Sequence, residues 1–500
     1  MSASFATPDR ANVQGLILRG YTHPFSCHLL FSFSTGAKSA DTKSFFNDLY
    51  PKVQNSLDWG TNKPVSMLNI GLTFNGLSLL NIVAQNDLIN FPASYRQGPW
   101  SGGSQASLAD VFDPDSTPSG WWNGNGDAVN ASLHCVIHAY ALTNNDLTTL
   151  VNFITTSATK NGLKEILPLA PTNSGGRLYQ SIVYNDQNKI HFGYTDGISE
   201  PSLSIPGTAG LPTAEDYSNF LIGYANSSIS EPGPFDTSTS GVFAKDGCYN
   251  AFRIIYQDVY NFNNFIKDQA KKFADTLSYL GLSEPELEEW FAAKLCGRWR
   301  NGSPLMLNPL KPGNDVTPGT GEGFGYTELS DPTLPNADIP SGARCPFSAH
   351  TRVANPRNQA LDSSEGSNGP PRILRRGMPY GPTFEGTTRD DVDRGLIGLF
   401  LCGNLSGQFE KIYGWMNYNN FSDPPVYGIK HPPQDALLGN RKAVLSPNFP
   451  GLTLDFTIPL EGNSSVPSIT VTLPSLLKTR GTAYCLLPGM ASIAKMAGRS

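Results

Sequence analysis

A chain of 500 residues is longer than one hydrophobic core usually spans, so two domains are expected. Hydrophobic residues make up 39% and charged residues 16%, while 49 glycines and 39 prolines indicate a globular protein with many turns. The net charge of −6 argues against a nucleic-acid partner, which requires clustered lysine and arginine, and the sequence has no apolar run of the length that spans a membrane.

The first half of the chain shows strand and helix patterns in alternation. Short runs of apolar, β-branched and aromatic residues predict strands, and apolar residues at intervals of three and four predict helices. In chain order these are a strand in 25–34, a helix in 42–57, a strand leading into a short helix in 66–83, a strand in 132–142 and a helix in 144–158. The polar stretch 97–129 is predicted to be a long loop.

The second half begins after a connector rich in proline, glycine and serine, within 204–241. The predicted elements that follow are a strand and helix in 247–274, a helix in 284–299, a proline- and glycine-rich region in 302–371, a strand in 395–404 and a helix in 406–421. This order fits an α+β fold better than a wound parallel sheet. We therefore predict two domains, 1–225 and 226–500.

Cysteine and asparagine patterns bear on the cellular compartment. The seven cysteines are scattered without a CxxC pair, which predicts buried small hydrophobes rather than a disulfide lattice or a zinc site. The first 20 residues lack the features of a secretory signal. Six Asn-x-Ser sequons are nevertheless compatible with secretion: Asn130, Asn226, Asn301, Asn404, Asn420 and Asn463. We expect an extracellular protein, with a cytoplasmic one as the alternative.

The segment "HFGYTDGISEP", residues 191–201, places Asp196 between Gly193 and Gly197. Glycine and aspartate dominate turns, so a solvated turn carboxylate is the ordinary explanation. An acid held in a glycine loop, in a chain with so few charges, is also a candidate functional group.

His350 lies in "CPFSAHTRVANPR", where a regular element is not expected to begin before Ala349. An isolated histidine is most often a hydrogen-bonded structural residue. Zinc is poorly supported, because Cys345 and His350 lack a second pair at metal spacing. One neutral imidazole, however, suffices as the axial ligand of a haem iron.

Three arginines, Arg372, Arg375 and Arg376, occur close together in "RILRRGMPYGP". Such a cluster is ordinarily a solvated edge. In a chain with only 36 basic residues, three arginines beside apolar side chains suggest an anion, such as a propionate or a developing oxyanion.

Taken together, these segments resemble a known family. "GYTDG" fits the GxxDG motif of the dye-decolorizing peroxidases, "CPFSAHTRVANPR" resembles that family's haem-ligand segment, and "ILRRGMPYG" resembles its distal arginine segment, all in family order. "NVQGLILRG", "GCYNAFRIIYQDVYNF" and "AAKLCGRWRNGSPL" extend the resemblance over nearly the whole chain. It implies two ferredoxin-like α+β domains, each an antiparallel sheet with peripheral helices, and a haem b between the sheet and helices of the second.

The resemblance also implies roles for individual residues. Asp196 is the expected distal acid–base group, and Arg375, rather than the arginine that follows it, is expected to stabilise negative charge during O–O cleavage. His350 is the expected iron ligand, with Asp435 in "QDALLGN" as the carboxylate partner of its other ring nitrogen. Arg352 is expected to contact a haem propionate.

Bulky dyes and lignin-like phenols do not fit a pocket built for peroxide, so their oxidation is expected to proceed through aromatic side chains at the surface. Tyr380 matches a surface radical tyrosine of some members, and Trp415 is the second candidate; ordinary core packing is the alternative for both. Two features depart from the family pattern. Ala436 replaces a proline. Many fungal members have a Leu-x-Phe pair on the strand that corresponds to 395–404, whereas this chain offers Leu399, Phe400, Leu401 and Cys402 in a different phase.

The predicted function is that of a haem peroxidase that uses H2O2 to oxidise dyes and phenolic or lignin-like aromatic compounds by one-electron steps. The main alternative is a haem-binding carrier or storage protein in which Asp196 and Arg375 merely frame the cavity. A haem-dependent oxygenase, a hydrolytic side activity and a haem-free interaction module are further alternatives. The expected partners are H2O2 and small aromatic reductants, and the sequence does not determine the oligomeric state.

Overall fold

The computed structural model of this protein describes most of the chain. The described residues are 7–33, 39–170, 174–186, 188–204, 215–224, 237–317, 323–326, 342–357, 361, 370–418, 434–440, 455–460 and 465–499. In these ranges helices and strands alternate along both halves of the chain. None of the helices found there is long and apolar enough to cross a membrane.

Most first-half elements lie where the sequence predicts them. They are β1 (Phe25–Ser32), β2 (Ser66–Leu72), α3 (Phe74–Leu80), β3 (Cys135–Ala141) and α8 (Asn144–Lys160). Helix α2 (Ser39–Leu49) ends earlier than predicted, and a single 3-10 turn with Pro51 follows it. Proline has no backbone N–H and cannot continue an α-helix, which explains the early end.

The prediction of a long loop in 97–129 is wrong, because the structure forms short helices there. These are α5 (Gly102–Leu108), α6 (Trp121–Gly124) and α7 (Gly126–Ser132). The Ser101 side chain caps α5 by accepting a hydrogen bond from the Ser104 N–H, and the Trp121 and Trp122 rings are buried. Tertiary burial of this kind supports helices whose own sequence is too rich in glycine and serine to indicate them.

Five second-half elements also match the prediction. They are β8 (Cys248–Gln257), α10 (Val259–Lys272), α11 (Glu284–Cys296), β11 (Gly395–Cys402) and α13 (Lys411–Tyr418). The structure adds α12 (His350–Ala354), β9 (Leu374–Arg375), β10 (Met378–Tyr380), β12 (Asp455–Pro459), β13 (Ser468–Thr472) and β14 (Leu477–Leu487).

Strands of both halves form one antiparallel sheet. Its order is β10-β5-β1-β3-β2-β14-β8-β11-β9, where β5 is Leu178–Ser181, and β4 (Lys164–Ile166) pairs with β1. Because β10 pairs with β11 as well as with β5, the sheet closes on itself. The two halves meet at short junctions, in which Leu486 pairs with Leu72 and Tyr380 pairs with Gln180.

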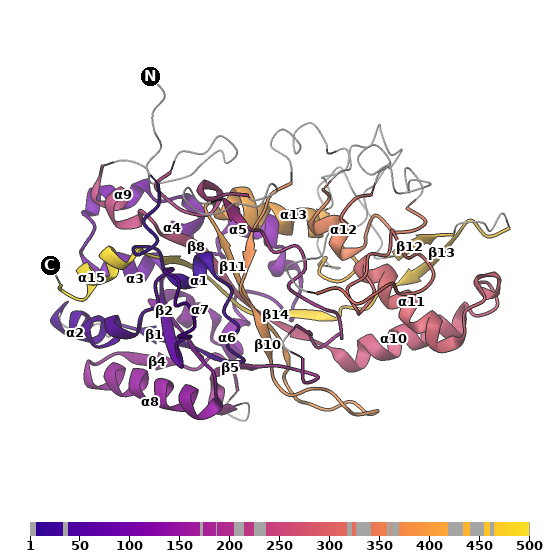
Figure 1. The fold of residues 1–500 in the computed structure, drawn as a ribbon, viewed down its shortest axis with the longest axis horizontal. Coiled ribbons are helices and arrows are strands. Elements are labelled where there is room, and N and C mark those ends of the chain that lie inside the picture. The colour runs from indigo at the N-terminus through magenta and orange to yellow at the C-terminus, as the bar shows by residue number, and fades with distance from the viewer. Residues whose placement is uncertain are drawn as a thin grey trace, which may run out of the picture.

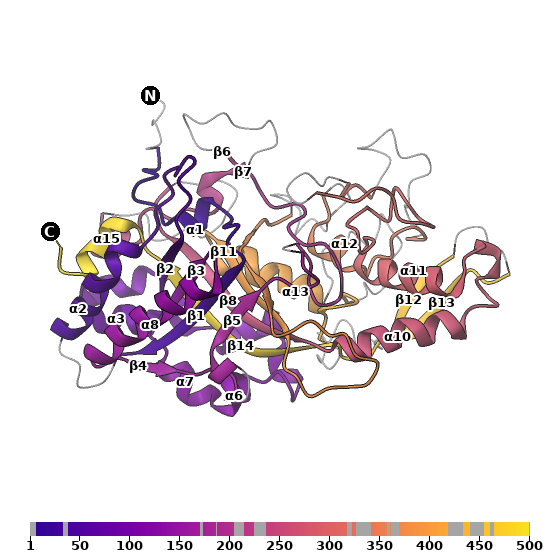
Figure 2. The same ribbon diagram turned by 60° about the horizontal axis from the view of Figure 1, so that its bottom comes forward.

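Both halves repeat the order strand, helix, strand, strand, helix, strand. In the first half these are β1, α2, β2, β3, α8 and β5, and in the second β8, α10, β10, β11, α13 and β14. Helices α2 and α8 lie at the end of the molecule that carries the C-terminus, and α10, α11 and the β12–β13 hairpin project at the opposite end (Figures 1 and 2). The fold is therefore α+β, and the predicted domain boundary at 225/226 lies outside the described residues.

The sheet buries side chains on both faces. Successive side chains of a strand point to opposite faces, so each strand serves two cores. In β11, Ile397, Leu399 and Leu401 are fully buried in the interior of the closed sheet. The alternate side chains of β11 point outward, and this outward face forms one wall of the candidate site.

All seven cysteines are buried, as their scattered spacing predicts. The sequons give less support to a secreted protein. Asn130 and Asn404 are 7% and 1% exposed and therefore cannot accept a glycan in the folded state. Asn226, Asn420 and Asn463 lie outside the described residues. An extracellular location therefore stays a prediction.

Two histidines face each other inside the closed sheet. His28 on β1 lies opposite His138 on β3, and their Nδ1 atoms are 2.9 Å apart. Burial lowers the pKa of His28 to about 4 and holds the pKa of His138 well below its ordinary value, an effect to which the neighbouring His28 adds. Both rings are therefore neutral at physiological pH.

We expect the protein to lose stability as the pH falls from about 6.5 toward 4. In that window His28 and His138 bind protons in the unfolded chain but stay neutral in the folded protein. The free energy of unfolding therefore decreases with falling pH. His28 alone accounts for about 2 kcal/mol between about pH 7 and about pH 4.5. Urea unfolding at both pH values measures the loss, and His28→Gln should reduce it; an equal pH dependence in the variant would contradict this assignment.

Candidate active site

A cavity of about 250 Å³ is lined by Asp196, Arg375 and His350, three residues from distant parts of the sequence. Leu396, Gly398 and Phe400 of β11 belong to the same lining, as alternate residues on the outward face of that strand. The cavity therefore carries a glycine two positions before Phe400, where the family pattern has a leucine. Most of the remaining wall is apolar, which suits a hydrophobic ligand.

Asp196 is held by a loop in which left-handed backbone recurs. Gly193 and Gly197 have φ values of +86° and +76°, and Ser199 has +63°. Such φ values favour glycine, which explains why glycines flank the acid. The Asp196 N–H donates to the Asn188 carbonyl at 2.6 Å and so anchors the loop. The glycine loop thus directs the Asp196 carboxylate into the cavity wall.

Arg375 pairs with this carboxylate. Its Nη1 donates to Asp196 Oδ1 at 3.0 Å, and each of the two side chains is 35% exposed. Desolvation lowers the pKa of Arg375, but the carboxylates of Asp196 and Glu200 raise it by more, so it lies above its ordinary value. Arg376 instead donates to backbone carbonyls of α1 (Gly15–Leu18). The structure thus brings Arg375, and not Arg376, to Asp196.

His350 begins the short helix α12, consistent with the expectation that no regular element starts before Ala349. Its Nδ1 lies 2.8 Å from Oδ2 of Asp435, which is completely buried. The other Asp435 oxygen accepts the backbone N–H groups of Leu437 and Leu438, both at 2.8 Å. The carboxylate is therefore held on both oxygens and contacts His350 through Nδ1. Nε2 makes no hydrogen bond to any residue that the structure describes and is available to a metal.

Arg352 does not join this site. Two positions along an α-helix correspond to a rotation of about 200°, which turns Arg352 away from His350. Its side chain is fully buried, donates to the Cys345 carbonyl and stacks at 3.9 Å over the Phe347 ring. It is absent from the described cavity lining. The structure therefore does not support the predicted contact of Arg352 with a haem propionate.

The two predicted surface aromatics are buried. Tyr380 is 1% exposed, lies in the interior of the closed sheet and donates its hydroxyl proton to Asp393 Oδ1 at 2.8 Å. Trp415 is 2% exposed and packs with Ile412 and Met416. The prediction that either side chain lies at the surface is wrong, because large rings gain most by filling a core.

Two further arginines line the cavity. Arg372 donates to Glu215 Oε1 at 2.9 Å, and its pKa is lowered to about 10, first by burial and then by Arg357, so it remains charged at neutral pH. Arg298 donates to the Gly302 carbonyl at 2.7 Å. The arginine cluster had suggested an anion site that includes Arg372. The segment "AAKLCGRWRNGSPL", which contributed to the family resemblance, contains Arg298, but no role was predicted for this residue.

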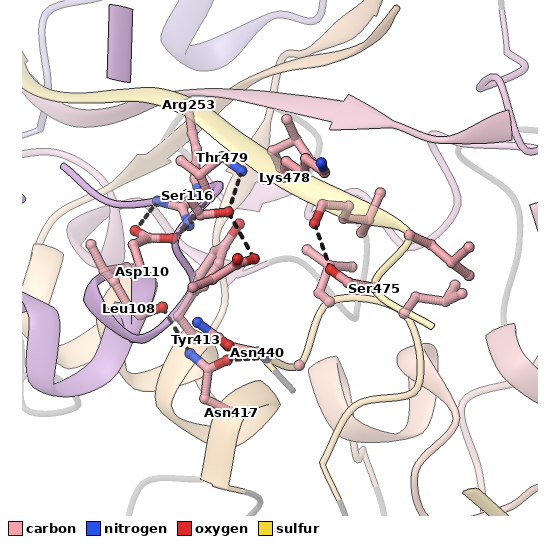
Figure 3. Close-up of a pocket in the computed structure, with 17 residues that line it drawn as sticks. Leu108, Asp110, Ser116, Arg253, Tyr413, Asn417, Asn440, Ser475, Lys478 and Thr479 are labelled. Carbon is pink, nitrogen blue, oxygen red and sulfur yellow. Dashed lines mark hydrogen bonds and ion pairs between the residues drawn. The ribbon is translucent and has the colours of Figure 1, made fainter. Parts of the chain in front are cut away.

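A second cavity, of about 40 Å³, shares lining residues with the first, among them Tyr413 and Leu437. Figure 3 shows this second cavity, with Tyr413 and Asp110 among the labelled side chains. It borders a buried ion pair in which Arg253 of β8 donates to both carboxylate oxygens of Asp110, at 3.0 and 2.6 Å. The Thr479 hydroxyl donates to the same carboxylate at 2.8 Å. This network ties the 3-10 turn Asp110–Phe112, β8 and β14 together behind the cavity wall.

We expect Asp110→Asn to lower the free energy of unfolding by about 3 kcal/mol or more, because the charge of Arg253 then stays buried without a counter-ion. Chemical denaturation measures the loss. The control is the double variant Asp110→Asn with Arg253→Met, which removes both charges and should recover part of the stability. A double variant less stable than the single one would show that the unpaired charge is not the cause.

Comparisons with known proteins agree with this fold. No family model matches the chain. Peroxidase 2 of Mycetinis scorodonius is 26% identical over 510 residues, which cover 96% of this chain and 86% of that protein. A dye-decolorizing peroxidase of Mycena epipterygia is 28% identical over 325 residues, 62% of this chain and 58% of that protein. A solved fungal DyP-type peroxidase from Auricularia auricula-judae aligns with a TM-score of 0.73 and 22% identity, over 98% of this chain and all of that one.

The solved structures establish the fold, which is the α+β fold of the DyP-type peroxidases, a class of haem-containing oxidoreductases. The relatives that match most of the sequence are peroxidases of the same kind. Over most of its length the chain is similar to dye-decolorizing peroxidases in sequence and in fold.

Proposed function

We propose that this protein binds haem b and uses H2O2 to oxidise dyes and phenolic or lignin-like aromatic compounds in one-electron steps. One observation carries the proposal: a single cavity holds both an ion-paired Asp196 and Arg375 and a histidine backed by a buried carboxylate. Solved relatives are described in complexes with 2,6-dimethoxyphenol and with cyanide, which supports an aromatic reductant and a ligand-binding haem iron.

The residues of the cavity fit a haem. His350 offers Nε2 to the iron, while Asp435 holds Nδ1 and fixes the ring orientation. The apolar wall suits the porphyrin, and a cation is needed for the propionates. Because Arg352 points away from the cavity, we assign the contact with a haem propionate to Arg372, which lines the cavity and is charged at neutral pH.

Bound haem supplies the iron at which peroxide is reduced and the oxidising equivalents that aromatic compounds consume. Asp196 takes a proton from one peroxide oxygen and returns it to the other, so that water can leave. Its Oδ2 is the atom for this transfer, because Oδ1 accepts from Arg375 and no described residue bonds to Oδ2. The Arg375 guanidinium stabilises the negative charge that develops as the O–O bond breaks.

We expect Arg375→Leu to lower kcat/KM for H2O2 by about 10²- to 10³-fold, because one preorganised cationic donor is lost. Steady-state oxidation of 2,6-dimethoxyphenol at varied H2O2 measures the effect, and the haem content should stay that of the wild type. A carrier that only stores haem would show little H2O2-dependent turnover even in the wild type. Retention of full activity in the variant would count against the proposed reaction.

We also propose that residues 1–225 and 226–500 are two ferredoxin-like units. The repeated order of strand, helix, strand, strand, helix and strand supports this division. The two units then share the site, because Asp196 comes from the first, and Arg375 and His350 come from the second.

A further inference from the structure

Glu200 is a second carboxylate that holds Arg375. Its Oε1 accepts the Arg375 backbone N–H at 2.7 Å, and its Oε2 lies 3.6 Å from Arg375 Nε. The same Oε1 accepts from Arg376 Nη1 at 2.6 Å. Glu200 therefore fixes both the backbone and the guanidinium of the proposed charge-stabilising arginine.

Among the residues that the structure describes, one short stretch of the loop supplies every group that holds the guanidinium. Asp196 Oδ1 accepts from Nη1 at 3.0 Å, the Ile198 carbonyl accepts from Nη2 at 2.8 Å, and Glu200 lies beside Nε. The residues between them, Gly197 and Ser199, both have left-handed backbone. The alternating backbone thus turns three successive acceptors toward one arginine.

Glu200 approaches Arg375 from outside the main cavity. It lines a separate cavity of about 160 Å³, whose wall also includes Asp196 and Arg375, and it is not in the described lining of the 250 Å³ cavity. Its side chain is 20% exposed. Glu200 can therefore orient Arg375 without occupying the space proposed for haem and peroxide.

This arrangement prevents a stronger pairing of Arg375 with Asp196. A guanidinium and a carboxylate prefer a bidentate pair with two parallel hydrogen bonds. Here Arg375 makes only one hydrogen bond to Asp196, because Nη2 is held by the Ile198 carbonyl and Nε faces Glu200. A bidentate pair would occupy Asp196 Oδ2, the oxygen that the proposed function assigns to proton transfer.

We propose that Glu200 is a positioning residue that keeps Arg375 from closing onto Asp196, so that one oxygen of the Asp196 carboxylate stays free for proton transfer. The role rests on the proposed function, because it concerns the same acid and the same arginine. Glu200 itself touches neither haem nor peroxide in this role and acts only through Arg375.

The test compares Glu200→Ala with Glu165→Ala in the holoprotein. Glu165 on β4 is a matched control, because it also is 20% exposed and bonds to an arginine, Arg177. Cyanide is the probe, since hydrogen cyanide must give its proton to a distal base when it binds. We expect Glu200→Ala to weaken cyanide binding about tenfold, Glu165→Ala to leave it unchanged, and a crystal structure of Glu200→Ala to show a bidentate Arg375–Asp196 pair.

A double-mutant cycle separates positioning from an independent effect. Glu200→Ala should lower kcat/KM for H2O2 in the wild-type background and change nothing further in Arg375→Leu. The proposal would be overturned if the effects of Glu200→Ala and Arg375→Leu on kcat/KM were fully additive. It would also be overturned if Glu200→Ala changed neither the position of Arg375 nor the cyanide affinity. If Glu200→Ala does not fold, Glu200→Gln replaces it, because glutamine keeps an acceptor oxygen and loses only the charge. A wild type that binds cyanide without oxidising aromatic compounds would refute the proposed function, while Glu200 would still be judged by the cyanide affinity and the Arg375 position.

Discussion

His350→Ala is expected to give a folded protein that retains little haem. The His350 side chain is 27% exposed, so its removal leaves no large void in the core. The proposed axial bond is lost, however, together with the ring that Asp435 orients. We expect the variant to show a strongly reduced Soret absorbance per protein after reconstitution with haem, and H2O2-dependent turnover to fall in parallel.

Asp435→Asn is the informative companion of that variant. Asparagine keeps an oxygen for the backbone N–H groups of Leu437 and Leu438, but its amide cannot accept the Nδ1 proton of His350 as a carboxylate does. Loss of such an outer partner typically costs about 10- to 100-fold in metal affinity, so the haem affinity should fall by less than in His350→Ala. Full haem content with unchanged axial ligation in His350→Ala would show that another residue binds the iron.

Asp196→Asn is expected to reduce kcat/KM for H2O2 by about 10²- to 10⁴-fold, the usual contribution of a general acid–base group. Asparagine has the same shape and still accepts a hydrogen bond from Arg375, but it cannot take up the peroxide proton. Haem content and thermal stability should remain those of the wild type. The measurement is the rate of reaction with H2O2 under conditions in which the aromatic reductant does not limit turnover.

Asp186→Asn is the control for this variant. Asp186 accepts the backbone N–H of Asn188 in the preceding loop, a bond that asparagine can preserve, and it belongs to neither described cavity lining around Asp196. We expect Asp186→Asn to react with H2O2 as the wild type does. Equal losses in both variants would point to a general disturbance of the loop, and no loss in Asp196→Asn would favour a haem carrier.

Much of the fold could be predicted because its strongest elements have a clear local period. Strand β1 and helix α8 show it, and the structure places both within a residue or two of the prediction. The short helices in 97–129 could not be predicted in this way. Their residues favour turns, and the burial of Trp121 and Trp122 outweighs that preference only in the folded chain.

The site was predicted unevenly for a similar reason. Motif order singled out Asp196, Arg375 and His350, and these residues share one cavity. A short motif does not indicate how far a side chain is exposed to solvent. The prediction that Tyr380 and Trp415 lie at the surface was therefore wrong. Tyr380 is buried because a junction of the closed sheet covers it, and that junction pairs it with Gln180, far away in the sequence.

By itself, the sequence determined the α+β class, the main strands and helices, and which acid, arginine and histidine were candidates for the site, because local periodicity and short motifs carry that information. Only the tertiary structure decided that Arg352 points away, that Arg372 reaches the cavity and that Glu200 holds Arg375. Those outcomes depend on contacts between segments far apart in the chain, and the orientation of a side chain follows from what packs against it rather than from its neighbours in sequence.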